Sequence, residues 1–243
     1  MSDLLILGGT TEARMLCAQV HLMGIDATVS LAGVTSRPET LPIKTRNGGF
    51  GGVDGLCSWL EMHRTKALID ATHPFATKMP TNAEAACARL GLPRLRLVRP
   101  GFARVAGWSS APNLEAALLS LQPGQNVLLT TGKNDLGGVA QRPDLRILIR
   151  TIEPIEDLPP HARNLLIRPP LNWEAEIDML AQHEIDVLIA KDSGGVTAPK
   201  LDAANALGVR VILIDRPPQP PGPIVTTVDE AVAWLPREVA IGT

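Results

Sequence analysis

The segment from Gly8 to Ala13 has the composition of a phosphate-binding turn. Its residues, Gly-Gly-Thr-Thr-Glu-Ala, follow the apolar run Leu4–Leu7 and precede a segment with the periodicity of a helix. In this position Gly8 permits a tight turn, the small residues let the backbone approach a pyrophosphate, and Ala13 lets the helix pack closely. The N–H groups at the start of the helix attract phosphate. The pattern predicts a dinucleotide site, although Thr10 stands where a glycine is usual; the alternative is an ordinary turn with a threonine cap.

The end of the next expected strand, 27–31, indicates which dinucleotide would bind. Turns that prefer NAD usually carry an acidic residue about 20 positions beyond the glycines, where it holds the ribose hydroxyls. The segment Thr28–Leu31 contains no acidic residue, and Ser36 and Arg37 follow shortly after it. An arginine pairs with a 2′-phosphate through charge-assisted hydrogen bonds. The sequence therefore favours NADPH with Arg37 as a phosphate ligand; the alternative is a solvated arginine in a loop.

Polar residues also follow three other expected strands, at positions where ligands of parallel sheets bind. In the first half of the chain, His73 lies in the run Asp70–Ala76. In the second half, Thr131–Asn134 and Lys191–Gly195 end two strands, and Lys200 lies shortly beyond. Lysines in these segments, near one cleft, favour an anionic substrate. The alternatives are a loop cap for His73 and solvated surface positions for the lysines.

Several other functions are excluded by missing residues. The chain has no tyrosine, so the Tyr-Lys acid of short-chain dehydrogenases cannot be present. Asp192–Gly195 reads Asp-Ser-Gly-Gly, as near the nucleophile of some serine proteases, but it follows a buried strand in an α/β chain where no such barrel is expected. Gly132 and Lys133 do not form a nucleoside-triphosphate loop, because Val127 stands in place of its first glycine and Asn134 in place of its Ser/Thr.

The amino-acid composition limits which binding partners and which cellular compartment are expected for this chain. With a formal net charge of −2 and 3% aromatic residues, the chain offers neither a phosphate-neutralising surface nor a stacking platform, so nucleic acid is not an expected partner. No apolar run approaches the roughly 18 residues of a membrane helix, so we expect a cytoplasmic protein without membrane partners. Three cysteines without a C-x-x-C pair or a nearby histidine indicate small buried side chains rather than a metal site.

Short apolar runs and helical segments alternate along the chain. The expected strands are 4–7, 27–31, 42–46, 67–72, 94–98, 126–131, 145–152, 165–168, 186–190 and 209–214, with a last short one after the proline-rich turn 216–223. The expected helices are 10–23, 53–63, 77–90, 173–183, 198–207 and 228–235. Continuous apolar strands of this kind are typical of parallel sheets buried on both faces.

The length of the chain bounds the number of domains. Its 243 residues, 45% of them hydrophobic, can bury one large core or two modest ones. The alternating pattern starts again after Arg99-Pro100-Gly101. We therefore expect an α/β protein with two doubly wound, Rossmann-like domains, residues 1–98 and 99–243, with parallel sheets and a cleft between them. The first domain would bind NADPH and the second the substrate, and the oligomeric state stays open.

Four motifs occur in order along the chain. They are L-I-L-G-G-T-T-E-A-R at Leu5–Arg14, D-A-T-H-P-F-A at Asp70–Ala76, T-T-G-K-N at Thr130–Asn134, and A-K-D-S-G-G followed by T-A-P-K-L-D-A-A within Ala190–Ala204. Together they resemble the precorrin-6A reductase family of cobalamin biosynthesis, and the resemblance spans nearly the whole chain. The segment from Gly48 to Gly55 is, in addition, unusually rich in glycine.

The resemblance implies a reaction and roles for the residues. NADPH would deliver a hydride to carbon 19 of precorrin-6A, a tetrapyrrole macrocycle with several acetate and propionate carboxylates, and a proton would complete the reduction. The cofactor-binding residues would be Gly8, Gly9, Thr10, Thr11, Glu12, Ala13, Ser36, Arg37, Thr72 and His73. The substrate-binding residues would be Arg14, Lys133, Asn134, Asp192, Ser193 and Lys200. His73, Lys200 or solvent would donate the proton.

Two other functions stay open at this point. A non-catalytic NADP(H)-binding redox sensor would bind NADPH but turn over no tetrapyrrole. A reductase of another anionic small molecule would oxidise NADPH with a different substrate. The sequence fits a macrocycle that is metal-free as well as one that holds cobalt.

Overall fold

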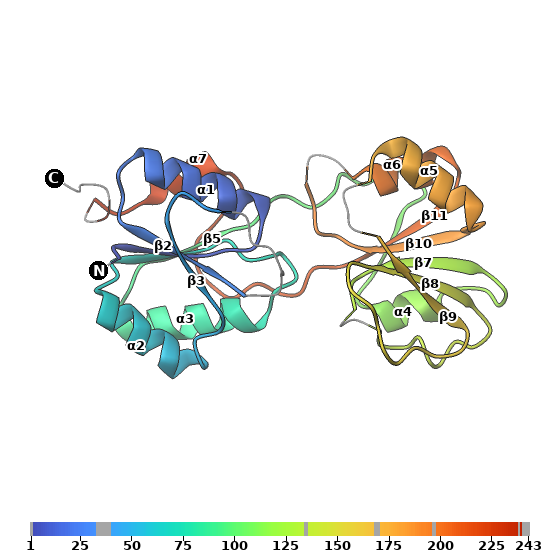
Figure 1. The fold of residues 1–243 in the computed structure, drawn as a ribbon, viewed down its shortest axis with the longest axis horizontal. Helices are drawn as coiled ribbons and strands as arrows, with labels where there is room; N and C mark the ends of the chain where they lie inside the picture. Colours follow the sequence, from blue (N-terminus) through green and yellow to red (C-terminus); the bar gives the residue numbers. More distant parts are fainter. Residues whose placement is uncertain are drawn as a thin grey trace. The chain divides into compact units, whose positions relative to one another are not determined.

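The chain forms two compact units, each built around one sheet. The computed structural model describes residues 2–32, 40–133, 136–167, 171–195, 198–237 and 239. One unit comprises residues 1–100 and 217–243, and the other comprises residues 101–216. In each unit a six-stranded sheet with parallel pairing carries helices on both faces (Figure 1). The predicted α/β class with two doubly wound parallel sheets is confirmed.

The first unit has the strand order of a Rossmann sheet. Its strands are β1 (Leu4–Leu7), β2 (Ala27–Leu31), β3 (Lys44–Asn47), β4 (Ala67–Asp70), β5 (Arg94–Leu97) and β12 (Ile224–Val225). Its helices are α1 (Thr11–Leu22), α2 (Val53–His63), α3 (Lys78–Leu90) and α7 (Val228–Trp234). The order β12-β5-β4-β1-β2-β3 reverses direction between β1 and β4. Helices α1 and α7 cover one face of the sheet, and α2 and α3 cover the other (Figure 1).

The burial of apolar residues explains where these strands form, and capping residues explain where the helices begin and end. Every residue of β1 and β4 is buried, as expected of strands that are covered on both faces. Helix α1 begins after Thr10, whose hydroxyl accepts a hydrogen bond from the N–H of Ala13 at 3.1 Å. Helix α3 ends at Gly91, which adopts a left-handed φ of +62° that glycine tolerates without strain. Because all strand pairs of this sheet are parallel, the carboxyl ends of its strands meet at one edge.

The C-terminal segment belongs to the first unit, whereas residues 99–243 were predicted to form the second domain. Strand β12 pairs with β5, so that Ile224 lies opposite Arg96, and α7 packs beside α1 (Figure 1). Val228 and Ala231 of α7 are buried in the same hydrophobic core as residues of β1 and α1. The prediction was wrong here because a short strand and helix fit the edge of either sheet, and their local pattern does not say which.

The second unit repeats the architecture of the first. Its strands are β6 (Ser109–Ala111), β7 (Asn126–Thr130), β8 (Arg146–Thr151), β9 (Ala162–Leu166), β10 (Val187–Lys191) and β11 (Arg210–Ile214). Its helices are α4 (Leu114–Leu119), α5 (Trp173–Gln182) and α6 (Pro199–Ala206). The strand order is β6-β11-β10-β7-β8-β9. Helices α5 and α6 lie on one face of this sheet and α4 on the other (Figure 1).

Three short elements of the second unit differ from the prediction. Neither β6 nor α4 was expected, because three and six residues are too few to show a periodic pattern. Helix α4 is set by a local cap, since Asn113 accepts a hydrogen bond from the N–H of Ala116 at 2.8 Å. Strand β9 lies at Ala162–Leu166 rather than at the predicted 165–168. In the described part of the chain, no helix has the length and apolar character needed to span a membrane.

Candidate functional site

A pocket of about 480 Å³ opens at the carboxyl ends of the strands of the first unit. Its lining comes from the ends of β1, β2, β3 and β4 and from the start of α3. The lining residues are Leu7, Gly8, Gly9, Ser30, Leu31, Ala32, Gly48, Gly49, Phe50, Thr72, His73, Ala76 and Met79. The pocket therefore spans the point where the strand order reverses, at which Rossmann sheets bind ligands. Its volume falls in the range of about 300 to 1,000 Å³ that small-molecule sites occupy.

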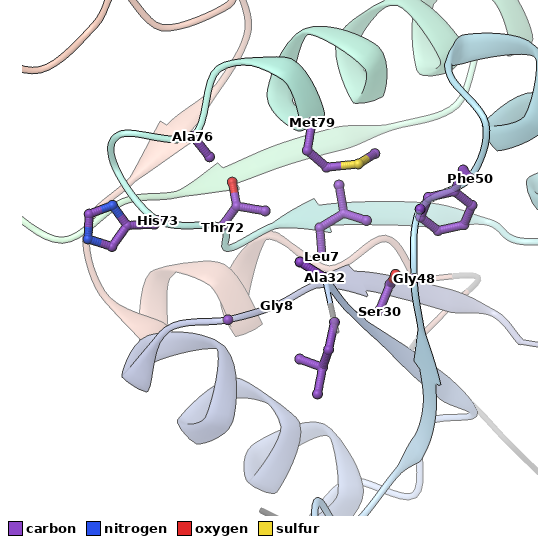
Figure 2. A pocket seen from close by; sticks show the side chains of 13 residues that line it. Leu7, Gly8, Ser30, Ala32, Gly48, Phe50, Thr72, His73, Ala76 and Met79 are labelled. Carbon is purple, nitrogen blue, oxygen red and sulfur yellow. The ribbon is translucent and has the colours of Figure 1, made fainter. Parts of the chain in front are cut away.

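The two ends of the pocket differ in character (Figure 2). At one end Ser30 lies next to Gly48, with the ring of Phe50 close by. At the other end lies the imidazole of His73, on the loop that follows β4. Thr72 faces the space between these ends. A long ligand would thus meet a glycine-rich, aromatic end and an end with a titratable group.

The glycine turn fits the phosphates of a dinucleotide. Gly9 has a φ of +116°, which disfavours any side chain, and a Cβ built there would have no described neighbour within 4 Å. A ligand can therefore reach the backbone at Gly9. Gly8 serves packing instead, because a Cβ there would lie 2.9 Å from Cγ2 of Val29 and 3.0 Å from Cδ2 of Leu31. The predicted turn residues Gly8 and Gly9 both line the pocket.

Thr10 and Ala13 fix the start of α1. Besides capping the helix at Ala13, the hydroxyl of Thr10 donates to the carbonyl of Ala71 at 2.9 Å, which joins the turn to the end of β4. Ala13 is buried against the sheet, as its small size predicts. Thr10, at the middle position of the glycine pattern, thus makes two structural hydrogen bonds with its side chain. The turn offers phosphate the backbone N–H groups at the start of α1.

The side chains of Glu12 and Thr11 contact protein groups rather than the pocket. The carboxylate of Glu12 pairs with Arg99 at 2.9 Å, and both side chains are mostly buried. Thr11 accepts a hydrogen bond from the guanidinium of Arg14 at 3.3 Å, on the exposed surface of α1. Neither residue is among those that line the pocket. A cofactor role for these two residues therefore rests on their backbone N–H groups.

A buried ion pair orients Thr72 in the pocket wall. The N–H and the hydroxyl of Thr72 both donate to Oδ1 of Asp70, at 3.0 and 2.7 Å. The other oxygen, Oδ2, accepts from Nη1 of Arg96 at 2.5 Å, and both charged side chains are completely buried. Removing one partner of such a pair costs about 3 to 5 kcal/mol because it leaves a buried charge uncompensated. The sequence motif that contains Thr72 is thus held by a residue of the neighbouring strand β5.

His73 lies at the exposed end of the pocket, and one of its ring nitrogens is engaged in a hydrogen bond within the loop. Its Nδ1 accepts a hydrogen bond from the N–H of Phe75 at 3.2 Å. A neutral His73 therefore carries its proton on Nε2. This arrangement suits a donor to a bound ligand, and it also provides the loop cap that was the alternative reading of the sequence.

The β3 side of the pocket was not predicted. Arg46 donates through Nη1 to Oγ of Ser30 at 2.7 Å and to the carbonyl of Gly48 at 2.9 Å, and through Nη2 to the carbonyl of Gly49 at 3.0 Å. Its Cζ lies 3.8 Å from the centre of the Phe50 ring. Burial lowers the pKa of the Arg46 guanidinium. The glycine-rich segment was the available signal, but the contact with Ser30 depends on the pairing of β2 with β3.

Three predicted site residues lie outside the described part of the chain. Ser36 and Arg37 follow β2, and Asn134 follows β7. Their assigned roles in binding the 2′-phosphate and the substrate stay predictions.

Lys200 is half-buried at the corresponding edge of the second sheet. It lies in the first turn of α6, and its Nζ donates to Oγ1 of Thr130 at 3.1 Å. The buried pair of Arg150 and Glu176, 2.7 Å apart, is part of the same environment. Burial, and after it the charge of Arg150, lowers the pKa of Lys200 to about 8, while Glu176 acts in the opposite direction. An ammonium with a pKa in this range can give up a proton near neutral pH.

Lys133 and Ser193 follow strands at the same edge of the second sheet. Lys133, just after β7, forms an ion pair with Glu153, and both side chains are 42% exposed. Such an exposed pair contributes about 0 to 1 kcal/mol, so Lys133 can exchange it for a ligand carboxylate. Ser193 is partly buried just after β10. Arg14, the third predicted carboxylate ligand, lies in the first unit on α1.

Both carboxylate oxygens of Asp192 contact groups of the protein, which indicates a structural role rather than that of a substrate ligand. Its Oδ1 accepts from the N–H of Phe102 at 2.8 Å, and its Oδ2 lies 3.2 Å from the guanidinium of Arg104. Its own carbonyl accepts from Nε of Arg216 at 2.7 Å. These partners belong to the segments with which the chain enters and leaves the second unit. The Asp192 side chain therefore links the first residues of this unit to the end of β10 through hydrogen bonds.

Comparison with known proteins places the chain in a family. A family model described as Precorrin-6x reductase CbiJ/CobK matches residues 3–236. A precorrin-6A reductase of Rhodococcus erythropolis is 43% identical over 97% of this chain and 98% of its own, and one of Rhodobacter capsulatus is 41% identical over 97% and 96%. A solved structure of CobK precorrin-6A reductase superimposes with a TM-score of 0.88 at 39% identity, covering 96% of both chains. This chain therefore belongs to the precorrin-6x reductase CbiJ/CobK family.

Proposed function

We propose that this protein is the precorrin-6A reductase of a cobalamin pathway and uses NADPH to deliver a hydride to carbon 19 of the macrocycle. The observation that carries the proposal is the pocket of the first unit, which combines a glycine turn with the reversal point of a Rossmann strand order. Membership in the CbiJ/CobK family supplies the substrate class.

The first unit would hold the cofactor. The backbone at Gly9 and the start of α1 would bind the pyrophosphate, and Thr72 and His73 would border the nicotinamide end of the pocket. Bound there, the reduced nicotinamide supplies the hydride. Asp70 and Arg96 would keep Thr72 in one orientation, because Thr72 has both its donors on Asp70.

The second unit would hold the substrate. Lys133 would exchange Glu153 for a carboxylate of the macrocycle, and Arg14 is the other proposed carboxylate ligand. Lys200 and His73 are the proposed proton donors. Desolvation lowers the pKa of Lys200 to about 8, and His73 has a proton on Nε2 when its ring is neutral.

The test is NADPH oxidation, followed by absorbance, after the protein is mixed with precorrin-6A or, separately, with its cobalt form. We expect oxidation that needs both the protein and one of these macrocycles. NADPH deuterated on the transferred position should place deuterium at carbon 19, detected by NMR of the product. A parallel reaction with NADH as the reductant measures the preference between the two dinucleotides.

Each result has a defined meaning. NADPH binding without oxidation by either macrocycle would overturn the catalytic proposal and favour a redox sensor. Oxidation that requires a different anionic acceptor would overturn the proposed substrate. Deuterium at any other carbon would overturn the proposed position of hydride transfer.

A further inference from the structure

Arg46 is a half-buried cation whose hydrogen-bond partners line the end of the pocket opposite His73. It lies on β3 directly opposite Ser30 of β2 in the parallel register. It donates hydrogen bonds to the hydroxyl of Ser30 and to the carbonyls of Gly48 and Gly49, at 2.7 to 3.0 Å. These three acceptors all line the pocket, as does Phe50, over whose ring the guanidinium lies.

Among the described residues, no acidic side chain neutralises the charge of Arg46. The hydroxyl and the two carbonyls are neutral acceptors, and no carboxylate of a described residue pairs with Arg46. The hydrogen bonds use three of the five N–H groups of a guanidinium. A partly desolvated guanidinium with remaining donors favours an anionic ligand, and its planar fork matches a phosphate.

The contacts of Arg46 hold it in place before any ligand binds. Phe50 stacks under the guanidinium and is itself anchored edge-on against Trp59, with ring centres 5.8 Å apart. Gly48 has a φ of +97°, and a Cβ at Gly49 would meet no described neighbour within 4 Å. The glycines therefore place no side chain beside the guanidinium, and because its contacts already hold Arg46, little side-chain freedom would be lost when a ligand binds.

The position of Arg46 in the sheet identifies the anion. In a Rossmann sheet the ribose next to the adenine lies at the end of β2, where an acidic residue selects NAD and an arginine accommodates a 2′-phosphate. Here the end of β2 carries Ser30, which is 7% exposed, with Arg46 bonded to it. We propose that Arg46, together with Ser30 and the Gly48–Phe50 segment, binds the 2′-phosphate of NADPH and sets the preference over NADH. This inference rests on the proposed function, since it names the residue that selects the proposed cofactor.

The test measures binding of two probes that differ only in the 2′-phosphate, adenosine 2′,5′-bisphosphate and 5′-AMP, by calorimetry on the full chain. The parent should bind the bisphosphate about tenfold to 150-fold more tightly, the factor that a charge-assisted hydrogen bond supplies. Arg46→Gln should remove most of this factor and leave the affinity for 5′-AMP nearly unchanged. Arg46→Lys, which keeps the charge without the fork, should retain an intermediate preference.

Lys44→Gln is the matched control. Lys44 lies two residues earlier on the same strand, is exposed, and pairs with Asp26 at 2.8 Å. Its loss removes the same charge from the unit, so a general electrostatic effect would appear in both variants. We expect Lys44→Gln to keep the full preference for the bisphosphate.

The inference fails if Arg46→Gln keeps the full preference, or if Arg37→Ala removes it while Arg46→Gln does not. It also fails if Arg46→Gln loses 5′-AMP as strongly as the bisphosphate, because Arg46 would then only support the fold of the pocket. A parent that binds both probes equally overturns this inference alone, because reduction of precorrin-6A, measured separately with NADPH and NADH, decides the proposed function.

Discussion

At the scale of single residues, the two glycines of the turn have different tasks. Gly8 is small because Val29 and Leu31 of β2 fill the space in which a side chain would lie. Gly9 lies in open space, and its φ of +116° is the feature that requires glycine. A substitution at Gly8 therefore disturbs packing as well as the phosphate site, and Gly9 is the better position at which to test cofactor binding.

Gly9→Ala should weaken NADPH binding at least tenfold. The alanine either keeps the strained backbone, at a cost of about 1 to 3 kcal/mol, or moves the turn away from the phosphates. The control is Gly24→Ala, since Gly24 also has a positive φ, of +70°, with no described neighbour within 4 Å of a Cβ, but does not line the pocket. Both variants should lower the melting temperature, and calorimetry should detect weaker NADPH binding in Gly9→Ala alone. Equal affinities in the two variants would remove the turn from the cofactor site.

Lys200 predicts a specific dependence of stability on pH. Its pKa is lowered from 10.5 to about 8 in the folded protein, mainly by burial. Between these two values the unfolded chain binds a proton that the folded protein does not, so raising the pH stabilises the fold. Below pH 8 both states hold the proton and the contribution of Lys200 to stability is constant.

Comparison with Lys200→Met isolates this effect. From pH 8 to 10.5 the free energy of unfolding of the parent should rise relative to the variant by up to about 1.4 kcal/mol per pH unit. Urea denaturation at a series of pH values measures the difference. Lys78→Met, at an exposed position of α3, should show no such slope. A constant difference between the parent and Lys200→Met would show that the ammonium is not desolvated in the folded protein.

At the scale of elements, the sequence predicted what local patterns determine. Strands β1, β2 and β4 and helices α1, α2 and α3 were expected close to their observed bounds, because buried runs and caps such as Thr10 act within a few residues. The glycine turn and the loop after β4 were found for the same reason. The contact of Arg46 with Ser30 was missed, because it depends on which strands pair and in what register.

Strand β5 shows a second limit of local patterns. Its sequence, Arg-Leu-Arg-Leu, alternates polar and apolar residues as strands with one solvent-exposed face commonly do, yet Arg94 and Arg96 are buried. Their guanidinium groups donate to the carbonyl of Pro221 and to Oε1 of Gln219, in the proline-rich segment that returns from the second unit. Prolines lack an N–H, so such a segment offers acceptors and needs donors from elsewhere. The arginines could be assigned to this role only once the segment was known to lie beside β5.

At the scale of the whole molecule, the first unit is assembled from two distant parts of the chain, residues 1–100 and 217–243, while the second is continuous. The C-terminal part supplies β12 at the edge of the sheet beside β5, and it supplies α7, whose Val228 and Ala231 are buried in the main core. It also supplies the acceptors for two buried arginines. Unpaired buried charges and an uncovered core are among the most destabilising changes known for small domains.

Three fragments test this dependence. Residues 101–216 alone should fold and melt cooperatively, because their sheet and both helical layers are continuous in the chain. Residues 1–100 alone should not, since Leu97 of the core would be uncovered, Arg94 would lose the carbonyl of Pro221, and Arg96 would keep Asp70 but lose Gln219. Joining residues 1–100 to 217–243 through a short Gly-Ser linker should restore cooperative melting, measured by circular dichroism, and binding of adenosine 2′,5′-bisphosphate, measured by calorimetry. If residues 1–100 bind this probe as tightly as the joined fragment, the C-terminal segment is dispensable for the cofactor pocket and its contacts with β5 contribute little to the unit.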